Sequence, residues 1–204
     1  DFRQRHQLGD RRLLLSVGRL TTRKGLREFV QHALPAIVQA APDTLLVVVG
    51  DAPADSLHAS VQTRASIQAV ADAAGIGQHL RFLGVITDPQ ELACAYESAS
   101  LHIFPVRHLP GDPEGFGMVA IEAAAHGLPT VAFATGGIVD AVAEGESGHL
   151  VAPGAYPSLA QAALQMLADG PGAWQTRASA FAAQFAWPTL GKRMLEALSV
   201  KSTL

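Results

Sequence analysis

The sequence predicts an α/β domain built on a doubly wound parallel sheet of about six strands. Short apolar segments alternate with longer helical segments through most of the chain. Strands that are apolar throughout, rather than at every second position, are typical of a parallel sheet covered by helices on both faces. Hydrophobic residues make up 49% of the 204 residues and charged residues 16%, which is enough for a sizeable core.

Six segments are expected to be strands, because each is a short apolar run flanked by turn residues. They are 12–17, 44–49, 80–83, 101–104, 130–134 and 149–151. Helices are expected from apolar periodicity and from capping residues. They are 26–40, 56–74, 89–98, 118–125, 138–143, 158–168, 173–185 and 189–199. Pro35 should kink or split the first helix, because proline disrupts a helix interior.

Composition argues against several functional classes. A net charge of −3 argues against a general nucleic-acid binder. Cys94 is the only cysteine, so no internal disulfide can form, which fits a reducing compartment. No apolar run approaches the roughly 20 residues of a membrane span. We therefore expect a cytoplasmic protein, and the absence of an initiator methionine suggests a piece of a longer one.

The most informative stretch is 112–122, where Glu114 and Glu122 bracket a glycine-rich turn that enters an apolar helix. A helix start carries unpaired N–H groups and partial positive charge, and glycine lets an anion approach the backbone. Carboxylates accept hydrogen bonds from hydroxyls. A ligand with phosphate between hydroxyl-bearing ends, such as a sugar nucleotide, fits this pattern. The alternative is an ordinary solvated helix start, but a charge at Glu122 in so apolar a helix favours function.

Other candidate residues also follow predicted strands, whose carboxyl ends meet at one edge of a parallel sheet. They are Gly18, Arg19, Lys24, Asp51, Pro53, Gly84, Val85, Ile86, His108, Glu114, Gly136 and Gly137. Arg19 and Lys24 could clamp a pyrophosphate, the former through two donors and the latter as a point charge. By contrast, Arg23 and Arg27 are expected to be solvated helix-start residues.

The histidines and the remaining motifs give little support to a metal site, a serine nucleophile or a nicotinamide cofactor. His108 could touch a ligand, although an exposed loop residue is the simpler expectation, and His102 is expected in the core or at the sheet end. No metal site is expected, because Cys-x-x-Cys, Asp-x-Asp and helically spaced histidine pairs are all missing. The segment 145–149 lacks the last glycine of a serine-nucleophile turn. No dinucleotide-binding Gly-x-Gly-x-x-Gly follows the first strand, so a nicotinamide cofactor is disfavoured.

The spacing Glu114-x7-Glu122, with Gly-Phe-Gly inside the gap, resembles the donor-site motif of retaining glycosyltransferases of family 4, which have the GT-B architecture. Segments 122–132, 136–137 and 17–25 are similar to neighbouring parts of that family. The resemblance covers roughly residues 13–168 and implies the Rossmann-like, donor-binding half of a GT-B enzyme. Three positions depart from the family pattern: Ala52 where it usually has glycine, Val139 where it usually has proline, and Asp140 where it usually has glutamate.

The resemblance implies roles for the matching residues. Arg19 and Lys24 would contact the donor diphosphate, and Glu114 would hold hydroxyls of the transferred sugar, which gives a catalytic set of these three. Glu122 would hold the ribose hydroxyls, and the loop at Gly84 would contact the base. The donor-binding residues implied are Gly18, Arg19, Lys24, Gly84, Val85, Glu114, Gly115, Phe116, Gly117, Met118, Val119 and Glu122.

The implied function is sugar transfer with retention from a UDP- or GDP-linked donor, with no metal or other cofactor. Residues 1–11 would be a linker, an interdomain segment or a short helix, 12–186 the donor domain, and 187–204 a helix that crosses to an N-terminal acceptor domain absent from this chain. The isolated chain is then expected to lack transfer activity, and a peripheral membrane association through the missing domain stays open.

Two alternatives also stay open: a non-catalytic nucleotide-binding or interaction domain of the same fold, and a GT-B relative such as a sugar-nucleotide epimerase or a phosphorylase-like enzyme.

Overall fold

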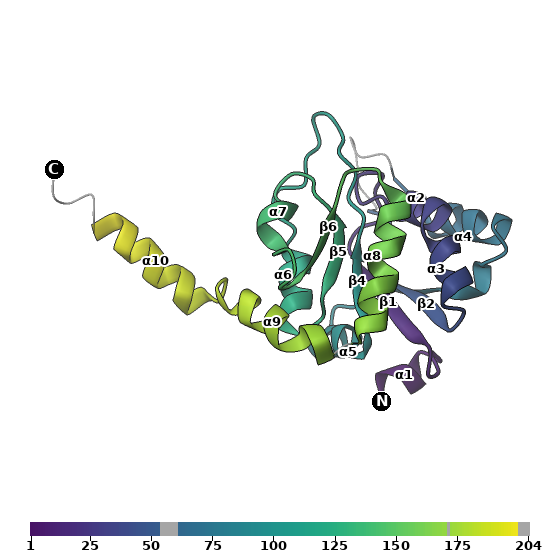
Figure 1. The fold of residues 1–204 in the computed structure, drawn as a ribbon, viewed down its shortest axis with the longest axis horizontal. Coiled ribbons are helices and arrows are strands. Elements are labelled where there is room, and N and C mark those ends of the chain that lie inside the picture. The colour runs from purple at the N-terminus through teal and green to yellow at the C-terminus, as the bar shows by residue number, and fades with distance from the viewer. Residues whose placement is uncertain (54–60, 171, 200–204) are drawn as a thin grey trace.

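A six-stranded parallel sheet forms the centre of the molecule (Figure 1). The computed structural model describes residues 1–53, 61–170 and 172–199. Neighbouring strands follow the order β3-β2-β1-β4-β5-β6, and every pair is parallel. The strands are β1 (Arg12–Val17), β2 (Thr44–Val49), β3 (Leu80–Gly84), β4 (Leu101–Phe104), β5 (Thr130–Phe133) and β6 (Gly148–Val151). The predicted doubly wound sheet is confirmed.

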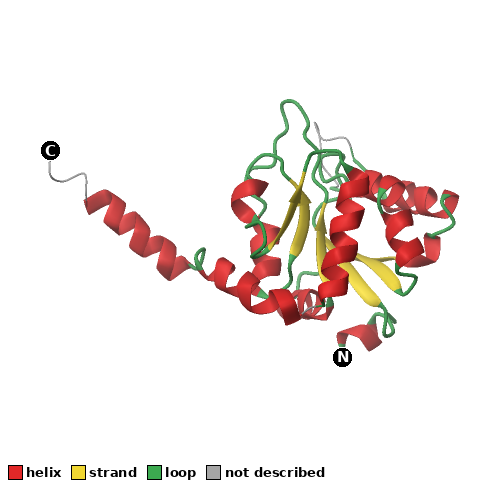
Figure 2. Ribbon diagram, in the orientation of Figure 1, coloured by secondary structure: helices red, strands yellow, loops and turns green. Residues whose placement is uncertain are grey.

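Helices cover both faces of this sheet (Figure 2). One face carries α2 (Leu26–His32), α3 (Leu34–Ala40), α4 (Arg64–Ala73) and α8 (Tyr156–Asp169). The other carries α1 (Phe2–Arg5), α5 (Pro89–Ser98), α6 (Met118–Ala125), α7 (Ile138–Ala141) and α9 (Gly172–Ala183). A short 3₁₀ turn, η1 (Gly77–His79), precedes β3. Because the central strand β1 is buried from two sides, Leu14 packs with one layer while Leu13 and Leu15 pack with the other.

One expected helix is divided in the structure, and another begins later in the chain than expected. Pro35 splits the first predicted helix: α2 ends at His32, and α3 begins with the proline in its first turn, where its missing N–H is harmless. The helix expected over 56–74 begins only at α4, so the expectation is wrong for residues 61–63; residues 56–60 lie outside the described ranges. Thr63 caps α4 through the amide of Ser66, and a bridge between Thr21 and Val61 keeps the preceding chain extended.

The N-terminal segment packs onto the domain. Phe2 of α1 and Leu8 are buried in the same cluster as Leu13 and Tyr96. The guanidinium of Arg3 donates to the carbonyl of Ser98 over 2.8 Å. Residues 1–11, predicted to be a linker, an interdomain segment or a short helix, therefore contain a short helix anchored beside α5.

The last described helix, α10 (Trp187–Ser199), stands away from the sheet domain (Figure 1). Its large apolar side chains are 40–83% exposed. They are Trp187, Leu190, Met194, Leu195 and Leu198. The role predicted for this segment, crossing to another domain, stays a prediction. Over the ranges described, no helix combines the length and the apolar character needed to cross a membrane.

His102 of β4 is a buried core residue, as the sequence predicts. Its Nδ1 lies 3.0 Å from Oγ1 of Thr130, and its Nε2 has no hydrogen-bond partner among the described residues. Burial, with a smaller contribution from the charge of Lys24, lowers the pKa of His102 to about 3. The folded chain therefore holds this imidazole neutral at pH values where the unfolded chain protonates it.

Replacement of His102 with asparagine should flatten the acid side of the stability profile. A histidine with an unfolded pKa near 6.5 takes up a proton on unfolding, so stability falls as the pH drops from about 6.5 toward 3. Between pH 7 and pH 5 this costs about 2 kcal/mol, and we expect the variant to lose that part of the pH dependence. Urea unfolding at both pH values measures it, with His108→Asn as the exposed control. An unchanged pH dependence in His102→Asn would refute the assignment.

Candidate functional site

The loops that follow the strands gather at the carboxyl edge of the sheet, around a cavity of about 320 Å³. Its lining comes from the ends of β1 and β2, the loop after β3 and the side of α5. The lining residues are Val17, Gly18, Arg19, Val49, Gly50, Asp51, Ala52, Pro53, Val85, Ile86 and Leu92. Most of these side chains are apolar. Gly84 is not among the lining residues, but its carbonyl accepts a hydrogen bond of 2.7 Å from the amide of the lining residue Gly50.

Beside this cavity an ion cluster joins two loops that are far apart in the sequence. Oε2 of Glu114 accepts hydrogen bonds from Nζ of Lys24, at 2.9 Å, and from Nη1 of Arg23. Nε of Arg23 lies 3.1 Å from Oδ1 of Asp112. The side chains of Lys24, Arg23 and Glu114 are only 17, 14 and 12% exposed, so their charges are poorly screened by water.

Arg23 is a residue that the sequence reasoning missed. It was expected to be solvated, and this is wrong because the loop after β4 places Asp112 and Glu114 directly over it. The available signal was the pair of carboxylates in a loop expected at the same edge, which need cationic partners when partly buried. Its neighbour Arg27 is exposed, as expected.

Lys24 is a desolvated cation. Burial is the main cause that lowers its pKa; the charges of Arg23 and Arg19 act in the same direction, and Glu114 opposes them. Its Nζ lies 4.8 Å from the centroid of the Phe104 ring. Arg19 is exposed, and its side chain has no hydrogen bond or ion pair among the described residues. Arg19 thus carries a charge at the carboxyl edge that is available to an anion, whereas the charge of Lys24 is shared with Glu114.

The glycine turn 115–117 before α6 packs against a second glycine pair, Gly136 and Gly137. The amide of Gly137 donates to the carbonyl of Glu114 over 3.1 Å, and a Cβ on Gly137 would lie 2.0 Å from the carbonyl oxygen of Gly115. Gly117, the N-cap of α6, has a left-handed φ of 90°, and a Cβ there would lie 2.9 Å from the ring of Phe104. These close contacts explain why glycine occupies both turns.

Around this turn the side chains differ in exposure. The ring of Phe116 packs against Phe185, with centroids 5.5 Å apart, whereas Met118 is 58% exposed. Gly115 is exposed, and Val119 is half-buried. The start of α6 is therefore open to a ligand on the side that carries Gly115 and Met118.

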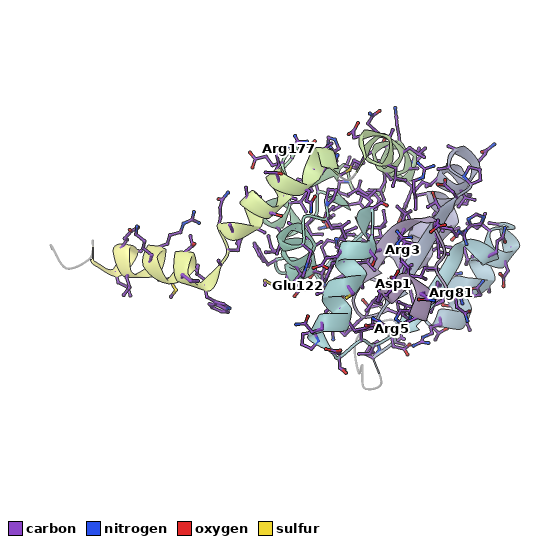
Figure 3. The ribbon with its side chains drawn as sticks, turned by 90° about the horizontal axis from the view of Figure 1, so that it is seen from below. Asp1, Arg3, Arg5, Arg81, Glu122 and Arg177 are labelled. Carbon is purple, nitrogen blue, oxygen red and sulfur yellow. The ribbon has the colours of Figure 1, made fainter. Side chains whose placement is uncertain are left out.

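Glu122 lies on the exposed side of α6, beside α5 (Figure 3). One carboxylate oxygen, Oε2, accepts a hydrogen bond of 2.9 Å from the hydroxyl of Tyr96. Burial, and then the charge of Glu122, raise the pKa of Tyr96, so its phenol stays a donor. Glu122 also borders a second hollow of about 370 Å³ between α6 and α9. Because Glu122 is exposed, water solvates its charge, so the expectation that the apolar helix would leave this charge in need of a functional partner is wrong; one oxygen is bonded to a tyrosine of the neighbouring helix.

The remaining candidates lie outside this cluster. His108 and Asp140 are exposed. Within the ranges that the structure describes, no group of three or more His, Cys, Asp and Glu side chains is placed to hold a metal ion.

Comparison with known proteins identifies the family and the fold to which this chain is similar. The family profile described as "Glycosyl transferases group 1" matches residues 11–169. The GDP-mannose-dependent alpha-(1-6)-phosphatidylinositol monomannoside mannosyltransferase of Mycolicibacterium smegmatis is 31% identical over 208 residues, which cover 97% of this chain and 50% of the relative. The D-inositol 3-phosphate glycosyltransferase of Corynebacterium aurimucosum is 35% identical over 172 residues, 83% of this chain and 38% of the relative.

Solved structures agree with the fold. HepE of Anabaena in complex with UDP superposes with a TM-score of 0.79 at 26% identity, over 97% of this chain and 51% of that one. The same protein in complex with UDP-glucose gives a TM-score of 0.77. The chain spans about half the length of the curated relatives that it matches most fully.

Proposed function

Because the chain belongs to the glycosyl transferases group 1 family, we propose that it binds the nucleotide-sugar donor of a glycosyltransferase. The observation that carries the proposal is the placement of an apolar cavity, two cations and a carboxylate side by side at one edge of the sheet. A nucleotide sugar presents a flat base, two phosphates and a hydroxyl-rich ring. The chain therefore offers a matching group for each part of the donor.

The base would enter the cavity after β1 to β3. Its walls include Val17, Val49 and Ile86, which suit the faces of an aromatic base, and the exposed Val85 stands at its mouth. The diphosphate would lie between this cavity and α6, where Arg19 and Lys24 supply positive charge. The amides at the start of α6 add hydrogen-bond donors that the helix itself leaves unpaired.

The two carboxylates would bind hydroxyls. Glu114 uses Oε2 for its cations, and among the described residues no hydrogen bond engages its Oε1, which is thus available to the transferred sugar. Glu122 would hold the ribose, with Tyr96 fixing one of its oxygens. Both carboxylates act as hydrogen-bond acceptors in this proposal, and neither is a nucleophile.

The chemistry proposed for the complete enzyme is transfer with retention of configuration. As the glycosidic C–O bond breaks, negative charge grows on the leaving phosphate, and Lys24, Arg19 and the α6 amides are already in place to stabilise it. These cations could neutralise the diphosphate without a metal ion. Transfer also needs a site for the acceptor, which we assign to an N-terminal domain; the exposed apolar side of α10 suits a helix that crosses to it.

UDP- and GDP-linked donors are the proposed classes. The mannosyltransferase relative is named as GDP-mannose-dependent, and HepE was solved with UDP and UDP-glucose. An apolar cavity that contacts a base mainly through its faces does not by itself choose between them.

Replacement of Glu122 with alanine tests the ribose assignment. We expect the wild-type chain to bind its nucleoside diphosphate about tenfold more tightly than the 2′,3′-dideoxy form, because hydrogen bonds to a charged acceptor are worth about 1.5–3 kcal/mol. The variant should bind both forms equally in calorimetric titration. The control is Glu97→Ala, which removes an exposed carboxylate from the adjacent helix α5. A Glu122→Ala variant that still prefers the ribose form would contradict the assignment.

A further inference from the structure

We propose that Arg23 is a positioning residue, which orients Glu114 so that Oε1 is presented to the transferred sugar. The inference rests on the proposed function, since it gives Arg23 a task in that same site. It starts from an arginine that is only 14% exposed and lies between two carboxylates of another loop.

Arg23 is fixed at several points. One arm of its guanidinium reaches Oε2 of Glu114, and Nε faces Oδ1 of Asp112 at 3.1 Å. Its backbone carbonyl accepts the amide of Arg107 over 2.8 Å. A planar guanidinium bonded in two directions has a defined orientation, unlike an ammonium, whose donors rotate freely. Arg23 therefore joins the loop after β1 to the loop after β4 in one geometry.

This geometry fixes the orientation of the Glu114 carboxylate. Oε2 accepts from both Arg23 and Lys24, so rotation of the carboxylate would break two charge-assisted hydrogen bonds. Oε1 then keeps its direction and, among the described residues, its accepting capacity. An acceptor that is already oriented binds a hydroxyl without paying the entropy of ordering its own side chain.

Arg23 and Lys24 are not equivalent in this arrangement. Lys24 is also the cation proposed to meet the donor phosphate, so a bound donor competes with Glu114 for its Nζ. Arg23 has a second partner in Asp112, so it can keep its hold on Glu114 while the phosphate is bound. We therefore infer that Arg23 acts on the sugar through Glu114 and not on the phosphates.

The test compares the affinity for a nucleotide sugar with that for its nucleoside diphosphate. UDP with UDP-glucose and GDP with GDP-mannose are titrated into the 204-residue chain by calorimetry. In the wild type the sugar should improve affinity. In Arg23→Met this improvement should fall by about tenfold, the size of one lost hydrogen bond to a charged group, while the diphosphate alone binds within about twofold of the wild type. Arg27→Met, which removes an exposed arginine four positions away, is the matched control.

A double-mutant comparison separates positioning from mere structural support. Glu114→Gln should lose the sugar-dependent improvement, and Arg23→Met should add nothing further in that background, because the group it orients is already altered. If Arg23→Met does not fold, Arg23→Lys serves instead, since lysine keeps the charge but cannot span both carboxylates.

The outcomes are distinct. An unchanged sugar-dependent improvement in the Arg23 variant overturns the inference alone. Weakened binding of the diphosphate itself also overturns it, since Arg23 would then act on the phosphates. If the effects of Arg23→Met and Glu114→Gln on the sugar-dependent improvement simply add, the inference is also overturned. Absence of nucleotide binding by the wild type overturns the proposed function, and this inference with it.

Discussion

Replacement of Lys24 with methionine should weaken nucleoside diphosphate binding to this chain by on the order of 100-fold. The ammonium is largely removed from water and stands at the carboxyl edge beside Arg19, so it would bond a phosphate directly at low screening. A hydrogen bond between charged partners contributes about 1.5–3 kcal/mol, and the lost charge attraction adds to it. Methionine keeps a similar length and apolar character, so the packing against Phe104 is retained.

Calorimetric titration at low salt measures this effect, and Lys192→Met is the control because Lys192 is exposed on α10. The fold should survive, since Glu114 keeps Arg23 as a partner. A Lys24→Met variant with wild-type affinity for the diphosphate would show that the phosphates lie elsewhere.

Replacement of Gly137 with alanine should destabilise the chain and also abolish tight nucleotide binding. The added Cβ would lie 2.0 Å from the carbonyl oxygen of Gly115 and 2.9 Å from Cα of Phe116, and both are backbone atoms that cannot turn aside. Overpacking of this kind costs about 1–3 kcal/mol. Relief of the clash moves the turn that presents Glu114, so affinity should fall along with the melting temperature.

Gly115→Ala gives the matched comparison within the same turn. A Cβ on Gly115 would have no atom of another residue, apart from its chain neighbours, within 4 Å, so stability should stay within about 0.5 kcal/mol of the wild type. The methyl group would nevertheless stand where the donor approaches the backbone, and binding should weaken. Thermal unfolding and titration of both variants separate the two effects. Equal stability of Gly137→Ala and the wild type would contradict the packing account.

The fold could be predicted almost entirely from the sequence, because the information is local. Continuously apolar segments such as 44–49 mark buried strands, and all six residues of β2 are buried. The helix expected over residues 61–63 is the exception. Here the bridge between Val61 and Thr21, which lie 40 positions apart in the sequence, overrides the local helix propensity. Local pattern does not reveal such pairings.

The clustering of Lys24 and Glu114 at one edge of the sheet could be predicted from the sequence, but the pairing of charges within the cluster could not. The chain order of Lys24 and Glu114 after β1 and β4 placed both at one edge, since those strands are neighbours in the sheet. The cations that pair with Glu114 are determined by the geometry of the two loops, which the sequence does not reveal. The ion pair between Arg23 and Glu114 was therefore not predicted. Tyr96 as the partner of Glu122 was equally out of reach, because it depends on how α5 packs beside α6.

The most direct test of the central claim is calorimetric titration of the wild-type chain with UDP, GDP and ADP, with inorganic pyrophosphate as the control. The account predicts saturable binding at one site by UDP or GDP, and clearly weaker binding of pyrophosphate, because the base and the ribose contribute through the cavity and Glu122. Binding of none of the three nucleotides, or equal binding of all of them and pyrophosphate, would contradict a donor site at the carboxyl edge of this sheet.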